Sequence, residues 1–389
     1  MKKKSEFRSR GVVKLASSLG VSLMLHCTLG VAQPSSSDKF ELNDTHFHLT
    51  NYIQNGTDIH EFLKMMGTKV GRVALFGIPL QQEWSYQNSG DIAPTYYLQT
   101  DAPLYYYSFT DAYIAMAYRS LSKEDRARFD PMITGFNPAD MYAADHIRRV
   151  LETFPGVFSG IGEFSIHKEF VSAKVAGETA SLQNPALDRI LDFAGTVGLV
   201  VLIHNDMDVP FAKEGSPPAY LDQMKALLKR HPNTTIIWAH TGMGRIVRPI
   251  NNHAAQLAAI LADPRFQNVC FDISWNEVAK YIIATQESAQ ISADLINRYP
   301  DRFLFGTDEV APSNQEQYLR VYYQYHSLWK LLDERTREKV LKGNYERIFD
   351  GARRKVRDWE VAHVSTIQVN PAMNAPGHAQ QEYDTSLTP

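Results

Sequence analysis

Short apolar runs that end in polar residues recur along the chain, and stretches with helical spacing lie between them. Several runs are continuous and rich in β-branched residues, which is typical of strands buried on both faces of a parallel sheet. The eight runs are Phe40–Leu42 leading to His46, Val70–Phe76, Met132–Phe136, Val157–Ile161 leading to Glu163, Leu199–Ile203, Thr235–Ala239, Val269–Ile273 and Phe303–Phe305. The intervening stretches with helical spacing include Ala139–Glu152, Pro185–Val197, Pro218–Arg230 and Ala254–Leu261.

Eight strands that alternate with helices predict a parallel (β/α)8 TIM barrel. An open doubly wound sheet shares this alternation and is the alternative fold. Residues 40–350 give 311 residues, whereas a typical barrel needs about 250. The longest predicted insertion, Pro79–Asp130, lies between the second and third strands. It contains the tyrosine-rich segment Tyr96–Tyr107 and then a helical pattern over Asp111–Arg128. We expect the tyrosines to cover a substrate, to form a subunit interface, or to pack.

The N-terminal segment differs in pattern from the rest of the chain. Lys2–Arg10 is basic, Leu15–Val31 is apolar with small residues, and Gly30–Ala32 offers the small side chains of a cleavage site. This pattern predicts a secretory signal peptide over residues 1–32. A membrane anchor is the weaker alternative, because the apolar run has only 17 residues and includes polar ones.

The pattern also predicts the domain limits. Residues 33–39 form a Pro/Ser-rich linker, and 40–359 form the barrel domain. Apolar periodicity ends after Trp359, and the residues from Asn370 onward are rich in Pro, Ala, Gln and Gly. Residues 360–389 are therefore predicted to be a disordered tail.

The charge of the chain indicates which class of partner it binds, and its cysteine content indicates its cellular compartment. The net charge is −3, but without the six basic and one acidic residues of the first 32 positions it becomes −8. An acidic body argues against nucleic acid as a partner and leaves a small molecule as the expected one. Cleavage would remove Cys27 and leave Cys270 alone, so no intrachain disulfide is expected. Export without a disulfide favours the periplasm, with no membrane contact after cleavage.

Metal-ligating residue types follow the predicted strands, at the end where barrel active sites lie. His46 and His48 point to the same side of an extended segment, because side chains alternate along a strand. The other polar strand ends are Glu163, His204, His240 and Asp308. Four buried imidazoles without partners would be costly, and a divalent metal explains their convergence. Nitrogen and oxygen donors without thiolate fit zinc, with manganese, iron or nickel as alternatives.

This ordered set resembles the amidohydrolase superfamily. The pattern His46-x-His48, His204, His240 and Asp308 carries the resemblance. The segments Trp238–Gly242 and Leu304–Asp308 are similar to the amidohydrolase-related family within it, which includes aminocarboxymuconate semialdehyde decarboxylase and several metal-dependent hydrolases. The resemblance covers roughly residues 40–350.

The resemblance implies a role for each of these residues. His46, His48 and His204 would be metal ligands, and Asp308 would ligate the metal and exchange protons with bound water. His240 would polarise the substrate or bind a second ion. Glu163 would either bridge two ions or orient a ligand histidine from outside the coordination sphere. One or two ions per chain are therefore expected, and a homodimer is compatible with a barrel of this kind.

The implied function is hydrolysis of an amide, lactone or ester bond in a small molecule by metal-activated water. The first alternative is a metal-dependent decarboxylase of a small aromatic or unsaturated carboxylic acid on the same site. The second is a barrel that binds without catalysis, which we disfavour because none of the expected ligands is missing. Asn205 and Arg245 follow strands that carry the site and Trp275 follows the seventh strand. All three are candidate substrate contacts, whereas the position of Arg248 favours a surface arginine.

Overall fold

Residues 39–364 are described in the computed structural model, so the predicted signal peptide, nearly all of the linker and the tail from residue 365 lie outside the described residues. The described part is built around one parallel sheet with strand order β10-β9-β8-β7-β6-β5-β2-β1-β11. Its strands are β1 (Leu42–His48), β2 (Val70–Phe76), β5 (Phe129–Ile133), β6 (Gly160–Ser165), β7 (Val200–His204), β8 (Ile236–Trp238), β9 (Val269–Asp272), β10 (Phe303–Leu304) and β11 (Glu309–Val310).

The two ends of this sheet meet, because β10 and β11 are two pieces of the eighth strand. The backbone N–H of Thr45 in β1 donates to the carbonyl of Phe305 at 3.1 Å, just after β10. Phe47 then pairs in parallel with Glu309 of β11. The sheet is therefore a closed (β/α)8 TIM barrel, as predicted, and the doubly wound alternative is wrong.

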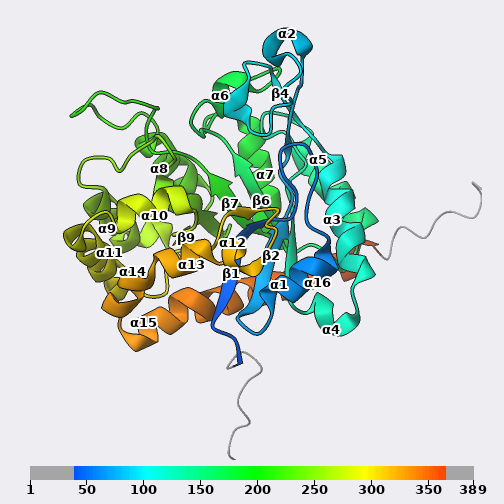
Figure 1. Cartoon of the computed structure of the whole chain (residues 1–389). Helices are drawn as coiled ribbons and strands as arrows, with labels where there is room; N and C mark the ends of the chain where they lie inside the picture. The colour runs from blue at the N-terminus through cyan, green and yellow to red at the C-terminus, as the bar shows by residue number, and fades with distance from the viewer. Residues whose placement is uncertain (1–38, 365–389) are drawn as a thin grey trace, which may run out of the picture. The chain divides into compact units, whose positions relative to one another are not determined.

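Helices surround the barrel on its outer side (Figure 1). They are α1 (Ile59–Met66), α2 (Tyr86–Ser89), α3 (Phe109–Ser120), α4 (Lys123–Arg126), α5 (Ala143–Thr153), α6 (Val171–Lys174), α7 (Pro185–Val197), α8 (Leu221–Arg230), α9 (His253–Ala262), α10 (Asn276–Ile282), α11 (Gln286–Arg298), α12 (Gln315–Tyr318), α13 (Arg320–Gln324), α14 (His326–Leu331), α15 (Glu334–Glu338) and α16 (Asn344–Val364). Single helical turns of other types cover Tyr97–Gln99, Ala239–Gly242, Pro264–Phe266 and Lys339–Gly343.

The boundaries of α7 agree with the sequence prediction because its capping signals are local. Asn184 accepts a hydrogen bond from the N–H of Ala186 at 2.9 Å, Pro185 occupies the first turn, and Gly198 ends the helix with φ +86°. The third strand begins three residues before the predicted run and the fourth begins three residues after it. Apolar residues of the flanking loops, such as Phe136 and Phe158, are as buried as strand residues, so the apolar runs do not mark the strand ends.

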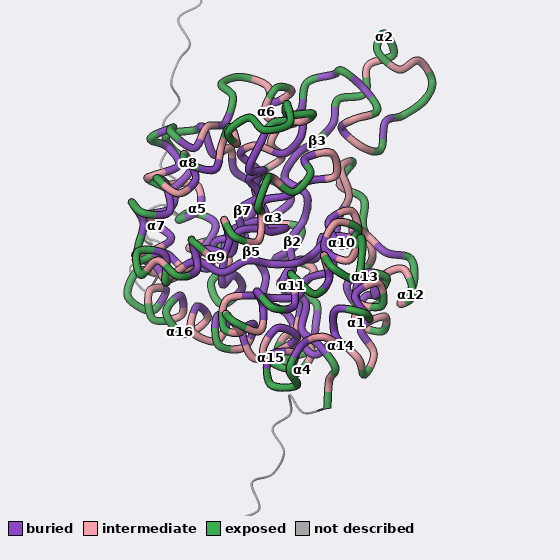
Figure 2. Tube along the Cα trace, turned by 90° about the vertical axis from the view of Figure 1, so that its left-hand side faces the viewer, coloured by how far each residue is buried: buried purple, intermediate pink, exposed green. Residues whose placement is uncertain are grey.

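Strand residues are buried (Figure 2), and their side chains form two separate apolar clusters. In β7, Val201 and Ile203 pack with the surrounding helices, whereas Val200 and Leu202 belong to a smaller cluster inside the barrel. This inner cluster includes residues of α16, among them Phe349. The α16 residue Arg353 donates to the carbonyl of Phe129, the first residue of β5, at 3.0 Å. Helix α16 therefore covers the end of the barrel at which the strands begin.

Helix α16 continues to Val364, so residues 360–364 are helical rather than part of the predicted tail. The extension is held by packing, because Trp359 contacts Phe193 edge-on and His363 stacks on Trp359 at 4.4 Å between ring centroids. Within residues 39–364, no helix combines the length and apolarity needed to cross a membrane.

The insertion after β2 contains an antiparallel pair, β3 (Leu80–Gln82) and β4 (Leu104–Tyr106), with its own small apolar core. Tyr97 is fully buried in that core and Tyr105 is 48% exposed, so the tyrosines divide between packing and surface. The insertion forms a bridge between Leu104 and Val175, the residue that follows α6, and Figure 1 shows β4 and α6 at the same end of the barrel.

Candidate metal centre

The polar strand ends singled out in the sequence converge at one place. His46, His48, His204 and His240 and the carboxylates of Glu163 and Asp308 are all buried, with side chains at most 6% exposed. Asp308 Oδ1 lies 3.1 Å from Nε2 of both His46 and His48. Glu163 Oε2 lies 3.4 Å from His48 Nε2. These four side chains form a first group of donor atoms close enough together to hold a metal ion.

Glu163 also belongs to a second donor group, together with His204 and His240. Its Oε1 atom lies 2.7 Å from His204 Nδ1 and 3.6 Å from His240 Nε2. The two oxygens of one carboxylate therefore face two different groups, Oε2 the first and Oε1 the second.

Positive backbone φ angles place two of these side chains. His240 has φ +55° and Asp308 has φ +50°, and neither is a glycine. This region costs a non-glycine residue of the order of 1–3 kcal/mol and persists only where surrounding contacts enforce it. For Asp308 the contact is the hydrogen bond from its own N–H to the carbonyl of His46, at 2.7 Å.

Asp272 and Ser274 at the end of β9 determine which ring nitrogens carry hydrogen. The Ser274 hydroxyl donates to Asp272 Oδ1 at 2.6 Å, because a carboxylate only accepts. Ser274 Oγ must then accept from His240 Nδ1, 2.9 Å away. His46 Nδ1 donates to Asp272 Oδ2 at 3.0 Å. In the neutral form of each ring, Nε2 is left as a lone pair. Neither of these buried Nε2 atoms makes a hydrogen bond to a described residue, although His46 Nε2 lies 3.1 Å from Asp308 Oδ1.

The other two imidazoles are oriented in a similar way. His48 Nδ1 lies 3.1 Å from the carbonyl of Gly77, which can only accept, so its Nε2 faces Asp308 as a lone pair. His204 Nε2 lies 3.0 Å from Asp206 Oδ1, which leaves Nδ1 to face Glu163.

The electrostatics of this cluster favour charge separation. Burial lowers the pKa of His46, His48 and His204, but the neighbouring carboxylates raise it by more, so the net shift is upward. Burial raises the pKa of Glu163 and Asp308, but the adjacent cationic groups bring it well below the ordinary range. The carboxylates therefore stay ionised and attract cations.

The sequence analysis missed three side chains of this cluster. Asp272 is the last residue of the seventh strand and Ser274 follows it, and the rule that polar strand ends carry the site would have found Asp272. Lys168 lies five positions after Glu163, with its Nζ 3.3 and 3.4 Å from the two Glu163 oxygens. Nothing in its sequence context distinguishes it from a surface lysine.

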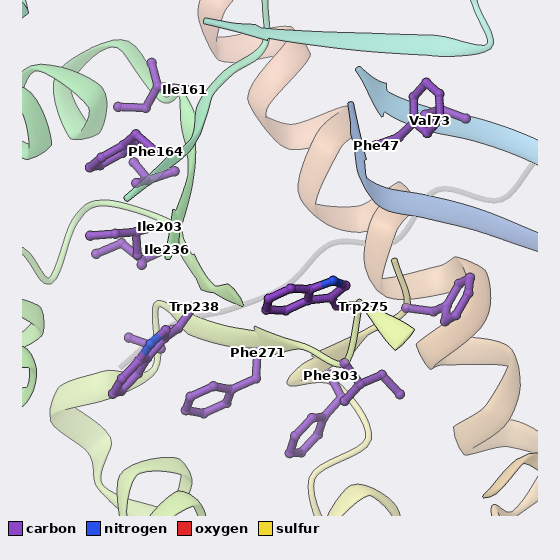
Figure 3. Close-up of a cluster of buried hydrophobic side chains, with 14 of the residues drawn as sticks. Phe47, Val73, Ile161, Phe164, Ile203, Ile236, Trp238, Phe271, Trp275 and Phe303 are labelled. Atoms are coloured by element: carbon purple, nitrogen blue, oxygen red, sulfur yellow. The ribbon is translucent and has the colours of Figure 1, made fainter. Parts of the chain in front are cut away.

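A cavity of about 240 Å³ opens beside His48 and Asp308. Two of the predicted substrate contacts, Arg245 and Trp275, line it, and Tyr52, Tyr96 and Lys168 complete most of its wall. Trp275 reaches this position with φ +76°, and Figure 3 shows its ring on the opposite side of the β9 ribbon from Phe271. Its centroid lies 5.2 Å from that of His240.

Asn205 and Arg248 do not line this cavity. Asn205 is fully buried. Its side-chain amide N–H donates to the backbone carbonyl of Asp206, and its backbone carbonyl accepts from the Trp238 indole N–H at 2.7 Å. Arg248 lines a separate groove between the loops after β7 and β8.

Three solved structures that are similar to this chain are distant from it in sequence. A dihydroorotase from Campylobacter jejuni is 13% identical with a TM-score of 0.49, covering 80% of this chain and 83% of its own. An amidohydrolase from Burkholderia multivorans with bound zinc is 12% identical with a TM-score of 0.48, covering 79% and 99%. An uncharacterised TIM-barrel protein from Bordetella bronchiseptica is 14% identical with a TM-score of 0.48, covering 80% and 99%.

No curated protein matches the chain in sequence. The family model described as amidohydrolase matches residues 43–351. This range includes all six of the polar strand ends and every strand of the barrel, apart from the first residue of β1. The chain belongs to the amidohydrolase family of metal-dependent hydrolases.

Proposed function

We propose that this chain is an exported hydrolase that holds two divalent cations and hydrolyses an amide, lactone or ester bond of a small molecule. The observation that carries the proposal is the placement of Glu163, whose two oxygens face two separate donor groups. The buried Nε2 atoms of His46 and His240 support it, because neither makes a hydrogen bond to a described residue and that of His46 faces a carboxylate oxygen 3.1 Å away. In the neutral rings, such buried lone pairs are costly unless a cation binds there.

The two donor groups indicate which residues would hold each ion. His46, His48 and Asp308 would hold one ion, His204 and His240 the other, and Glu163 would bridge them. Imidazole and carboxylate donors without thiolate fit zinc and also manganese, iron or nickel. Cys270, the one cysteine of residues 39–364, is buried in the inner cluster and does not belong to either donor group.

When bound, a divalent ion lowers the pKa of a coordinated water from 15.7 to about 7 and polarises the bond to be broken. A residue of the chain then transfers the proton from this water to the leaving group. The Asp308 carboxylate accepts it from water and returns it to the leaving group as the bond breaks. Its pKa, well below the ordinary range because of the neighbouring imidazoles, keeps it ionised. Trp275 and Tyr52 on the cavity wall exclude bulk water, which strengthens electrostatic stabilisation of the developing oxyanion.

Metal analysis of the purified protein, with Glu163→Gln and Asp308→Asn, tests the proposal. We expect about two ions per chain in the wild type, falling to about one in Glu163→Gln, because an amide cannot bridge two cations as a carboxylate does. Asp308→Asn should retain metal but lose most hydrolytic activity. Absence of metal after incubation with zinc or manganese would overturn the proposal.

A second candidate, a decarboxylase with one ion, is favoured by the contact between Lys168 and Glu163. The ammonium lies within 3.4 Å of both carboxylate oxygens, so Glu163 already has a cationic partner. In that case the wild type binds about one ion per chain, Glu163→Gln leaves this number unchanged, and turnover releases carbon dioxide without consuming water.

Export rests on the basic and apolar pattern of residues 1–32. N-terminal sequencing of the protein recovered from a periplasmic fraction tests it. A mature terminus near Gln33 is expected, and protein that keeps Met1 in the cytoplasmic fraction would contradict export.

A further inference from the structure

Apart from a histidine, two of the three charged residues on the cavity wall are cationic. Lys168 and Arg245 line the cavity, and Asp308, which belongs to the metal centre, is the one acidic residue among its lining residues. The remaining lining is aromatic and aliphatic or small and polar, with Tyr52, Tyr96 and Trp275 supplying the rings. Once Asp308 is committed to a cation, the wall presents positive charge and flat apolar surface.

The backbone of Arg245 is held on both sides. Its N–H donates to Glu169 Oε1 at 2.9 Å, and its carbonyl accepts from the Tyr281 hydroxyl at 2.9 Å. Glu169 is itself fixed, because its N–H donates to Asp206 Oδ2 at 2.7 Å and Asp206 contacts His204. The position of Arg245 is thereby coupled to the metal centre.

The guanidinium of Arg245 is oriented by two rings. It lies 4.5 Å from the centroid of Tyr96 and 5.5 Å from that of Trp275. Its Nε is buried and makes no hydrogen bond to any described residue. The Glu277 oxygen within ion-pair range is 4.0 Å away, and that same oxygen lies 2.6 Å from Lys280. A stacked guanidinium keeps its edge free, and that edge matches a carboxylate.

We infer that Arg245 is the anion-binding residue of this site and that the substrate is a small, planar carboxylate that meets the free edge of this guanidinium. The inference rests on the proposed function, because the bond to be broken must reach the metal centre beside His48 and Asp308. It adds to that function the chemical class of the substrate and the residue that selects it.

The lining favours carboxylate over phosphate and a small ligand over a large one. A carboxylate is satisfied by the two N–H groups of one guanidinium edge, whereas a phosphate has three oxygens to satisfy. The nearest further cation, Lys168, is engaged with Glu163. The cavity of about 240 Å³ lies below the usual range of about 300–1,000 Å³ for ligand pockets, so it fits a single ring with one or two substituents.

The test measures binding rather than turnover, with benzoate and its neutral isostere benzamide as probes. Both are titrated calorimetrically into the metal-loaded protein and into protein treated with a chelator. The variants are Arg245→Met, Arg245→Lys and the control Arg248→Met, which removes an exposed arginine from the same loop but outside this cavity. Metal content and thermal midpoint are recorded on the same samples.

We expect the wild type to bind benzoate about tenfold or more tightly than benzamide, as a charged hydrogen-bonded pair implies. Arg245→Met should bring the two affinities together with metal content unchanged, Arg245→Lys should restore part of the preference, and Arg248→Met should keep all of it.

A preference for benzoate that survives in Arg245→Met overturns the inference. So does a preference that disappears on chelation alone, because the carboxylate then binds the metal, and so does phenyl phosphate binding more tightly than benzoate. Absence of metal with the Arg245-dependent preference intact would refute the proposed function and leave the anion site standing.

Discussion

Asp272 Oδ2 accepts a hydrogen bond from His46 Nδ1 at 3.0 Å, and both side chains are fully buried. Asp272 Oδ1 meanwhile accepts from Ser274 and from the backbone N–H of His240. One carboxylate outside the two proposed coordination spheres therefore orients one ligand from each donor group.

Asp272→Asn should weaken metal binding. The substitution puts an N–H₂ group where one oxygen was. If that group faces His46, the ring must move its hydrogen to Nε2 and can no longer ligate through that atom. Loss of such a supporting contact lowers metal affinity by about 10–100-fold. Competition with a chromophoric chelator measures the change.

The matched control is Asp130→Asn, which alters an equally buried aspartate far from the strand ends. Asp130 pairs with Arg72 and Arg353 where the strands begin. Its substitution should lower the thermal midpoint and leave the metal affinity of the folded protein unchanged. Equal metal affinities for Asp272→Asn and the wild type would refute the positioning role.

Lys168→Met should tighten metal binding if Glu163 bridges two cations. The ammonium competes for the same oxygens, so its removal frees both and also removes a repulsive charge from the centre. An increase of about tenfold corresponds to ~1.4 kcal/mol of relieved repulsion. Lys280→Met, which removes a half-exposed lysine, should leave affinity unchanged. Unchanged or weaker metal binding in Lys168→Met would instead support Glu163 as an ion-pair partner only.

The sequence predicts the barrel well because its strands are buried on both faces. Such strands appear as continuous apolar runs, as in β2 and β7, which the structure places within one residue of the prediction. The pattern fails at the third and fourth strands because buried loop residues such as Phe136 extend the apolar runs. Solvent-facing polar residues, which mark the ends of strands in sheets with one exposed face, are absent there.

The candidate site is also largely predictable, for the geometric reason that parallel strands end together. That rule is sufficient to bring His46, His204 and Asp308 to one place. It cannot identify Lys168, which reaches Glu163 only through the path of the β6–α6 loop. It likewise suggests Asn205, which is fully buried and does not line the cavity.

Tyr97→Phe should destabilise the chain and loosen the cavity wall. The Tyr97 hydroxyl donates to Glu169 Oε2 at 2.5 Å, while Oε1 of the same carboxylate holds the backbone of Arg245. Its removal leaves a buried carboxylate oxygen without that donor, at a cost of about 1–3 kcal/mol. Chemical denaturation and the benzoate affinity should both report the change. Tyr105→Phe, in the same insertion but 48% exposed, should alter neither, and a similar response from both variants would contradict a specific role for Tyr97.

His253 should make the fold sensitive to mild acid. It is the first residue of α9, where the helix dipole disfavours a positive charge, and burial lowers its pKa to about 4 from an ordinary value of 6.5. Between pH 6.5 and 4 the unfolded chain therefore binds a proton at His253 that the folded chain does not bind. The stabilisation is complete above pH 6.5 and is lost as the pH falls towards 4.

His253→Gln removes this contribution, so its unfolding free energy should drop less than that of the wild type between pH 7.5 and 5.0, by about 1–2 kcal/mol. The metal-centre residues titrate in both proteins and cancel in this difference. His60→Gln, at an exposed position of α1, should follow the wild type, and an equal drop in His253→Gln and the wild type would show that His253 does not control the acid response.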